Sequence, residues 1–168
     1  MTPIVTDRLE LRTGSAAIYR IHFDDSAALA AALGVTVTDE WPVEHYDQPV
    51  VDLCAQRLNE GQAAEWLMRY VIERESDTLA GIIGSGGEPE EGAFVVGYSI
   101  LPFFRRRGFA SEALGGLLRW AFEQKGVDRA VAETYPHLTA SIRTLEKNGF
   151  ALAGPGSEEA TIRYERRK

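Results

Sequence analysis

Cysteine, histidine and long apolar runs are scarce in this sequence of 168 residues, and each scarcity excludes a class of protein. The single cysteine, Cys54, cannot form an internal disulfide, and the three histidines are too scattered to suggest a metal site, so we expect no bound metal. The longest run of small apolar residues, at 27–35, is too short to span a bilayer, and the first ten residues do not resemble a targeting segment. We therefore expect a cytoplasmic protein that does not insert into membranes.

Positively charged residues are also in the minority. The sequence has 18 lysines and arginines and 25 aspartates and glutamates, which gives a net charge of −7. This balance argues against a general affinity for nucleic acid or for anionic membranes and is compatible with a cationic substrate. With 45% hydrophobic residues, the chain can build one sizeable core, so we expect a single domain over residues 1–168. A monomer and a homodimer both remain open.

Three common nucleotide-binding and catalytic motifs are missing as well. The glycine-rich segment 84–92 lacks the Lys-Ser/Thr pair of a P-loop, and Pro89 interrupts the spacing of a dinucleotide-binding motif. Neither Ser85 nor Ser99 stands in the Gly-x-Ser-x-Gly setting of a hydrolase nucleophile.

Hydrophobic periodicity predicts the order of the elements. Alternation predicts a half-buried strand at 8–12, and helical spacing predicts helices near 28–33 and 50–58. The β-rich runs 66–74 and 78–84 should pair as a hairpin. Beyond them we expect a strand at 94–101 with a bulge at Gly97, a helix from Gly108 toward Gly126, a strand at 130–134, a helix at 139–150, and two strands near 151 and 161.

This order of elements suits an α/β (α+β) fold. We expect a single mixed, mostly antiparallel central sheet with helices on both faces.

The stretch RRRGFASEAL, at 105–114, places three arginines and a glycine between a buried strand and an amphipathic helix. The start of such a helix presents unpaired N–H groups and the positive end of the helix dipole, and this combination binds anions. Gly108 leaves room for a ligand to approach the backbone, and Ala110 keeps the next turn small. Three arginines alone would be typical of solvated surface, but in this setting they predict an anion site.

The spacing Arg105-x-x-Gly108-x-Ala110 resembles the Q/R-x-x-G-x-G/A motif of the GNAT superfamily of N-acetyltransferases. The segments TDRLELR at 6–12, GYSILPFFRRRGFASEAL at 97–114 and ASIRTLEKNGF at 140–150 resemble its ribosomal-protein N-acetyltransferase branch (RimJ/RimL type). The resemblance therefore covers most of the chain.

The resemblance implies a GNAT fold with a V-shaped opening between the strands at 94–101 and 129–134. It implies transfer of an acetyl group from acetyl-coenzyme A to a primary amine, either a peptide or protein N-terminus or a small molecule. The positions that it implies for the cofactor are Ser99, Ile100, Leu101, Arg105, Arg106, Arg107, Gly108, Phe109, Ala110, Ser111 and Ser141.

Several positions depart from the pattern of the family. Val95 stands where relatives carry an acidic candidate base, Leu138 where an asparagine is common, and Leu145 where many members use a tyrosine as acid. The ribosomal-protein branch instead offers Ser141 as the acid, although a serine in a first helical turn is as often a plain backbone partner. A catalytically weakened coenzyme A-binding sensor or partner-binding module of the same fold is therefore the alternative to an enzyme.

His137 and Glu133 are the remaining candidate bases near the implied site. A histidine can accept a proton near neutral pH, although an exposed loop histidine often has no function.

The family places its acceptor pocket in the loop that follows the first helix. There the candidate residues for a cationic amine are Asp39, Glu40, Trp41 and Glu44, because carboxylates and aromatic rings both attract cations. A solvated acidic loop is the alternative interpretation.

Overall fold

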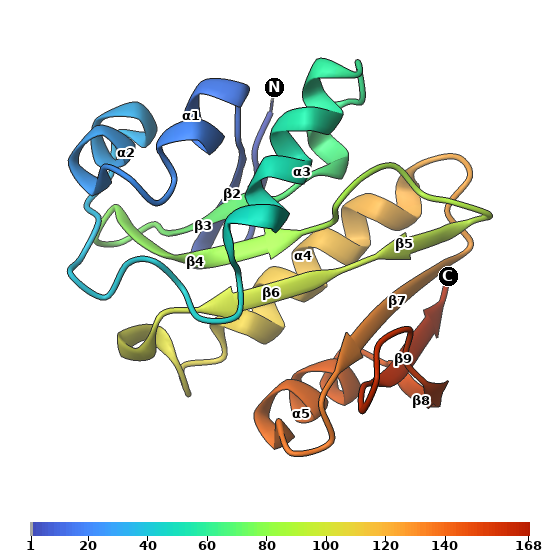
Figure 1. Ribbon diagram of the computed structural model, residues 1–168. Coiled ribbons are helices and arrows are strands. Elements are labelled where there is room, and N and C mark those ends of the chain that lie inside the picture. The colour runs from blue at the N-terminus through green and yellow to red at the C-terminus, as the bar shows by residue number, and fades with distance from the viewer. Residues whose placement is uncertain (1) are drawn as a thin grey trace.

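The computed structural model describes residues 2–168 as short strands interleaved with helices (Figure 1). The strands are β1 (Ile4–Val5), β2 (Leu9–Thr13), β3 (Arg69–Glu73), β4 (Thr78–Gly84), β5 (Ala93–Val95), β6 (Gly97–Ile100), β7 (Arg129–Thr134), β8 (Ala151–Pro155) and β9 (Ile162–Arg167). The helices are α1 (Ala16–Ile21), α2 (Ser26–Leu33), α3 (Gln48–Asn59), α4 (Phe109–Glu123) and α5 (Thr139–Lys147), with 3-10 turns at Ala64–Trp66 and Pro102–Phe104. Among residues 2–168, no helix has the length and apolarity needed to cross a membrane.

The strands form two sheets that meet around Val96. The first sheet has the order β1-β2-β3-β4-β6 and is antiparallel throughout. The second has the order β5-β7-β9-β8, in which β5 and β7 are parallel and the other pairs antiparallel. The expected α/β class with mostly antiparallel pairing is confirmed. The single strand expected at 94–101 is instead two strands, and they belong to different sheets.

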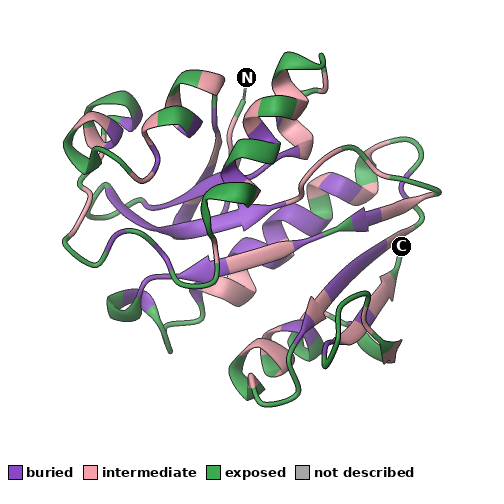
Figure 2. Ribbon diagram, in the orientation of Figure 1, coloured by how far each residue is buried: buried purple, intermediate pink, exposed green. Residues whose placement is uncertain are grey.

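Helix α4 connects β6 to β7 and passes behind the first sheet (Figure 1). One face of α4 is buried, and its side chains recur at helical spacing, as expected for an amphipathic helix that packs on a sheet. These buried residues are Ala113, Leu114, Leu117, Leu118 and Ala121. Figure 2 shows the buried residues concentrated in the strands of the first sheet and on the inner side of this helix.

The helices predicted near 28–33 and 50–58 are confirmed as α2 and α3. Helix α2 ends at Gly34 in the left-handed conformation, with φ of 67°. The prediction missed α1, a helix of six residues whose N-terminus is capped by the Ser15 side chain, which accepts a hydrogen bond from the Ile18 N–H. The predicted hairpin is confirmed as β3 and β4, although its first strand begins at Arg69 rather than at 66.

Gly81 in β4 allows close contact with β6, the strand that borders the candidate site. It lies opposite Ile100, and a side chain at this position would collide with the backbone carbonyl of Ser99. The two strands can therefore keep their pairing only because position 81 has no side chain.

We expect Gly81→Ala to lower the free energy of unfolding by about 1–3 kcal/mol, because the added methyl group overpacks a site closed by backbone. Urea denaturation measures the loss. Gly115→Ala is the comparison, since it replaces a glycine inside α4 and its methyl group would meet side chains and no backbone: Asn148 Oδ1 at 3.2 Å and Arg119 Nη1 at 3.8 Å. An equal loss in both variants would contradict the argument from strand spacing.

Candidate active site

The two sheets diverge after Val96 and leave one edge of β6 unpaired. The Val96 N–H donates to the Val131 carbonyl at 2.8 Å, whereas β6 pairs only with β4. The Leu101 N–H donates to the Ala80 carbonyl at 2.9 Å, so by alternation Tyr98 and Ile100 direct their backbone groups into the opening. Beyond Val96, β6 and β7 are therefore not paired with each other, as the expected opening requires.

The backbone groups that face this opening differ in part from those expected. Ser99 and Leu101 face β4, and the Leu101 N–H is already bonded, so these two backbones do not line the free edge. The Ile100 carbonyl faces the opening but accepts a hydrogen bond from Arg105 Nε at 2.9 Å. The free N–H and C=O of Tyr98 and the N–H of Ile100 remain for a bound chain.

Residues 102–108, here called the arginine turn, join β6 to α4. Arg106 has φ of 59° and Gly108 has φ of 80°, two left-handed residues on either side of Arg107. Gly108 precedes α4 and no side chain caps the helix, so the N–H groups of Phe109, Ala110 and Ser111 have no partner within it. The conformation of Gly108, more than the space around it, is what requires glycine, since a Cβ there would meet no atom closer than 3.5 Å.

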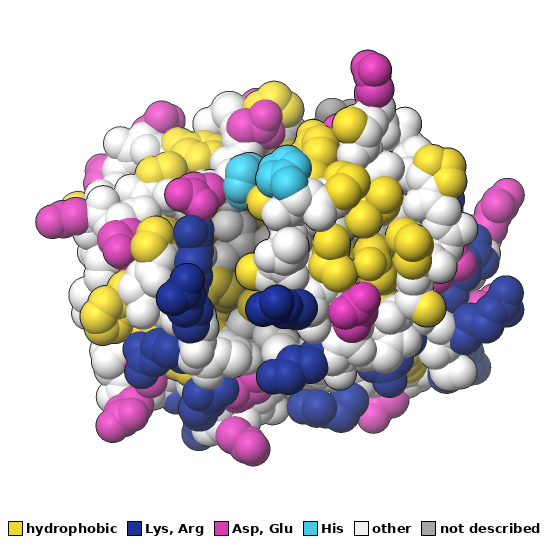
Figure 3. All heavy atoms as spheres, turned by 90° about the horizontal axis from the view of Figure 1, so that it is seen from below, with side chains coloured by type: hydrophobic (Ala, Val, Ile, Leu, Met, Phe, Trp, Pro, Cys, Tyr) yellow, Lys and Arg dark blue, Asp and Glu magenta, His cyan; other side chains and the backbone are white. Residues whose placement is uncertain are grey.

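The three arginines of this turn have three different environments. Arg105 forms an ion pair with Glu44, with Nη2 and Oε2 at 2.7 Å. The Arg107 guanidinium lies 5.0 Å from the ring centroid of Phe109, and Arg106 is exposed. Figure 3 shows lysine and arginine side chains gathered along the face seen from below, the side on which the arginine turn lies in Figure 1.

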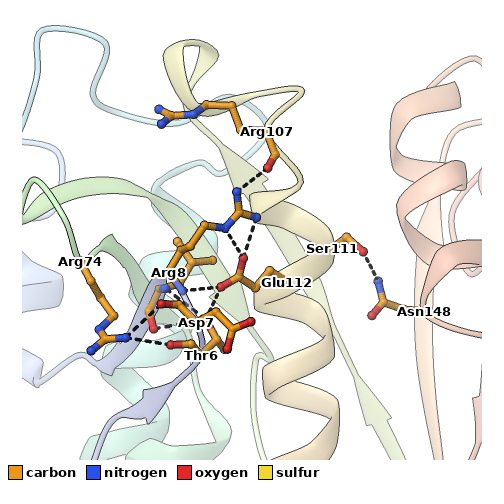
Figure 4. Close-up of polar contacts among 9 residues, drawn as sticks. Thr6, Asp7, Arg8, Arg74, Arg107, Ser111, Glu112 and Asn148 are labelled. Carbon is orange, nitrogen blue, oxygen red and sulfur yellow. Dashed lines mark hydrogen bonds and ion pairs between the residues drawn. The ribbon is translucent and has the colours of Figure 1, made fainter.

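A network of hydrogen bonds anchors the first turn of α4 to the turn between β1 and β2 (Figure 4). Glu112 accepts hydrogen bonds from Thr6 Oγ1 at 2.6 Å and from the Arg8 N–H at 2.8 Å, and it forms an ion pair with the Arg8 guanidinium at 2.6 Å. Arg8 also donates to the Arg107 carbonyl at 2.9 Å. Burial alone would raise the pKa of Glu112, but the bonds from Thr6 and Arg8 lower it below its usual value. No local pattern in the sequence indicates this network, because its partners are about a hundred positions apart.

Tyr98 crosses the opening from β6 to α5. Its hydroxyl lies 3.1 Å from the Ser141 carbonyl and 3.3 Å from Ser141 Oγ. Burial raises the pKa of Tyr98, so its phenol stays protonated and can donate. The sequence indicates Ser141 as a candidate but does not indicate Tyr98. The residue after α5 also contacts α4, through a hydrogen bond from Asn148 Nδ2 to Ser111 Oγ at 3.1 Å (Figure 4).

The two candidate bases differ in whether their side chains are held by ion pairs and hydrogen bonds. His137 is exposed in the loop before α5, where its ring stacks on Tyr135 with centroids 5.6 Å apart. Glu133 instead accepts hydrogen bonds from Ser157 and forms an ion pair with Arg163 at 2.9 Å. Burial alone would raise the pKa of Glu133, but these partners lower it, which makes its carboxylate a weaker base.

The candidate acceptor loop, residues 38–47, divides into a buried and an exposed part. Trp41 is only 9% exposed and its indole Nε1 donates to the His22 carbonyl at 2.8 Å, so its ring belongs to the core and does not present a face to solvent. This corrects the expectation that Trp41 would meet a cationic acceptor. Burial also lowers the pKa of the adjacent His22 to about 4, so this imidazole is neutral at pH 7.

The carboxylates of this loop face the arginine turn. Glu40 accepts a hydrogen bond from the Phe103 N–H at 3.0 Å, and Glu44 pairs with Arg105. Asp39 is exposed. Tyr46 fills the space that a side chain at Gly97 would need, so the loop reaches the point where the sheets diverge.

The divided sheet and the arginine turn agree with what comparison with known proteins finds. Residues 11–151 match the acetyltransferase (GNAT) domain family, and the chain belongs to this family of N-acetyltransferases. The uncharacterized N-acetyltransferase YjdG from Bacillus subtilis is 24% identical over 94% of this chain and 95% of its own.

Solved structures share the fold. An acetyltransferase from Salmonella typhimurium that modifies the N-terminal serine of a protein of the 50S ribosomal subunit has a TM-score of 0.70 and 19% identity, covering 99% of each chain. A ribosomal-protein α-N-acetyltransferase RimL in complex with coenzyme A has a TM-score of 0.68 and 22% identity, covering 98% of this chain and 97% of that one.

The anchoring of α4 by Glu112 predicts a pH dependence of stability. Because the pKa of Glu112 is lower in the folded chain, its stabilising effect is present above the usual carboxyl pKa of 4.5 and is lost as the pH falls below it. We expect Glu112→Gln to lower the unfolding free energy at neutral pH by about 1–3 kcal/mol. Between roughly pH 5 and pH 3 the stability of this variant should then fall less steeply than that of the wild type.

Urea denaturation across this pH range measures both effects. Glu123→Gln, at the exposed C-terminal end of α4, removes the same charge and should leave the stability close to that of the wild type. Parallel pH curves for the wild type and Glu112→Gln would show that the Arg8 pair contributes nothing.

Proposed function

We propose that this protein transfers an acetyl group from acetyl-coenzyme A to a primary amine. The observation that carries the proposal is the continuity between the free edge of β6 and the uncapped N-terminus of α4. An extended amide-containing arm can pair with the edge at Tyr98 and Ile100, as an added strand would. A pyrophosphate can then be held by the N–H groups of Phe109, Ala110 and Ser111, at the positive end of the helix dipole.

When bound, acetyl-coenzyme A supplies a thioester whose carbonyl carbon forms the new bond to nitrogen while its bond to sulfur breaks. The protein must provide a hydrogen-bond donor for the oxyanion, an acceptor for the proton of the amine, and a donor for the departing thiolate. We assign the Tyr98 N–H on the β6 edge to the oxyanion, and the Tyr98 C=O and the Ile100 N–H to the cofactor arm. We propose that Tyr98 and Ser141, whose hydroxyl oxygens lie 3.3 Å apart, donate to the thiolate.

We propose His137 as the base, either directly or through water. It is exposed beside α5 and is not held by an ion pair, whereas Glu133 is engaged with Arg163 and Ser157. The thiolate is a tolerable leaving group even with weak acid assistance, because a thiol has a pKa of about 8.5.

We further propose that the acceptor is a cationic amine that approaches along the acidic loop, past Asp39 and Glu44. Two of the structural neighbours act on ribosomal proteins, which supports a protein or peptide N-terminus as one acceptor class and leaves a small-molecule amine as the other.

We place the protein in the cytoplasm, where a thiol such as that of Cys54 stays reduced.

A coenzyme A-binding sensor of the same fold is the second candidate function. Val95, which is 55% exposed near the divergence of the sheets, offers no carboxylate, and Leu138 gives α5 no side-chain cap. Both functions require the cofactor, so only turnover separates them.

The cofactor site predicts a thermal shift. Coenzyme A at about a hundred times its dissociation constant should stabilise the fold by roughly 2.7 kcal/mol, which raises Tm by about 5–10 °C.

Gly108→Val should bind coenzyme A at least about tenfold more weakly, because valine disfavours the left-handed conformation and displaces N–H groups worth about 1.5–3 kcal/mol each. Differential scanning fluorimetry and calorimetry measure the two effects. Equal affinities for Gly108→Val and the wild type would contradict the phosphate site.

The proposed proton transfers predict the effect of substitutions on turnover. If His137 is the base, His137→Ala should lower the rate by about 10²–10⁴. Glu133→Gln should have a much smaller effect, and Tyr98→Phe should slow the reaction more than Ser141→Ala. Release of free thiol with a panel of amines and ribosomal peptides gives the rates. Binding of coenzyme A without turnover of any acceptor would favour the sensor.

A further inference from the structure

The candidate acceptor loop, residues 38–47, contacts the arginine turn at two points. The Glu40 carboxylate accepts the Phe103 N–H at 3.0 Å, and the Glu44 carboxylate pairs with the Arg105 guanidinium at 2.7 Å. The loop 38–47 and the turn 102–108 are about sixty positions apart in the sequence, yet they bring the proposed acceptor site and the proposed phosphate site into direct contact.

Arg105 occupies a central place in this contact. Its Nε donates to the Ile100 carbonyl on the free edge of β6, and its Nη2 is held by Glu44. The guanidinium that should attract an anionic phosphate is thus already paired with a carboxylate of the acceptor loop.

This pairing is of the kind that a phosphate can displace. The side chains of Arg105 and Glu44 are 42% and 58% exposed, and exposed ion pairs are weak. A pyrophosphate carries more charge than a carboxylate and fits the planar fork of a guanidinium with two parallel hydrogen bonds.

Resting on the proposed function, we propose that Glu44 is a positioning residue that couples the two substrate sites through Arg105. Without cofactor, its carboxylate holds the guanidinium. When the phosphates of coenzyme A take Arg105, the carboxylate is released and turns to the incoming cationic amine. The contact between Glu40 and the Phe103 backbone keeps the loop attached while Glu44 changes partner.

In this coupling Glu44 competes with the cofactor phosphates for Arg105. This determines whether removing Glu44 raises or lowers the affinity for coenzyme A. A residue that merely stabilised the turn would weaken binding of coenzyme A when it is removed, whereas a competitor strengthens it. We therefore expect Glu44→Gln to bind coenzyme A about two- to fivefold more tightly than the wild type, and the gain should shrink at high salt.

Titration calorimetry with coenzyme A, at about 0.05 M and about 0.5 M salt, tests this expectation. Glu123→Gln is the matched control, because it removes one exposed carboxylate from the far end of α4. Its affinity should equal that of the wild type. Arg105→Gln and the double variant Arg105→Gln/Glu44→Gln should bind coenzyme A equally, because the guanidinium through which Glu44 acts is gone in both.

Unchanged or weaker binding by Glu44→Gln would overturn the coupling, as would an equal gain in Glu123→Gln or a full gain in the absence of Arg105. These results would leave the proposed function intact, provided that the wild type binds coenzyme A. Failure of the folded wild type to bind coenzyme A would overturn both proposals together.

Discussion

The divergence of two sheets after Val96 is the constraint on which the rest of the site depends. One continuous stretch of chain pairs first with β7 and then with β4, so β6 is left with a row of backbone groups that have no strand beside them. Buried backbone groups need partners, and an unpaired edge invites an added strand. The arginine turn follows directly from this edge, which places the start of α4 and its unpaired N–H groups at the end of the same opening. An elongated ligand with an anionic end matches this succession of groups.

The sequence predicted the features that depend on neighbours along the chain. The spacing of Leu114, Leu117 and Leu118 identifies α4, and Gly34 identifies the end of α2, because helical periodicity and left-handed caps are local. The division of the strand at 94–101 depends on which partners β5 and β6 find. Those partners lie some fifteen to thirty-five positions away, and the apolar run itself is the same in either arrangement. Helix α1 was missed because six residues are too few to establish a periodicity.

The candidate site shows the same limit at the level of side chains. The sequence indicates that Trp41 and Glu44 share an acidic, aromatic loop, but it does not say which of them faces solvent. In the structure Trp41 packs on His22 in the core, while Glu44 reaches Arg105. The contact between Tyr98 and Ser141 could not be predicted from the sequence, because the two residues are 43 positions apart and meet only in the folded chain. The phosphate motif could be recognised because strand, turn and helix are contiguous.

The backbone supplies positive potential at the arginine turn that no side chain cancels. Arg8 is paired with Glu112 and Arg105 with Glu44. The Arg107 guanidinium lies over the uncharged Phe109 ring, which does not cancel its charge, and Arg106 is exposed. The N–H groups of the first turn of α4 cannot be neutralised in this way, because no side chain caps them. At the proposed cofactor site, these N–H groups would favour a phosphate that fits against the backbone over other anions in solution.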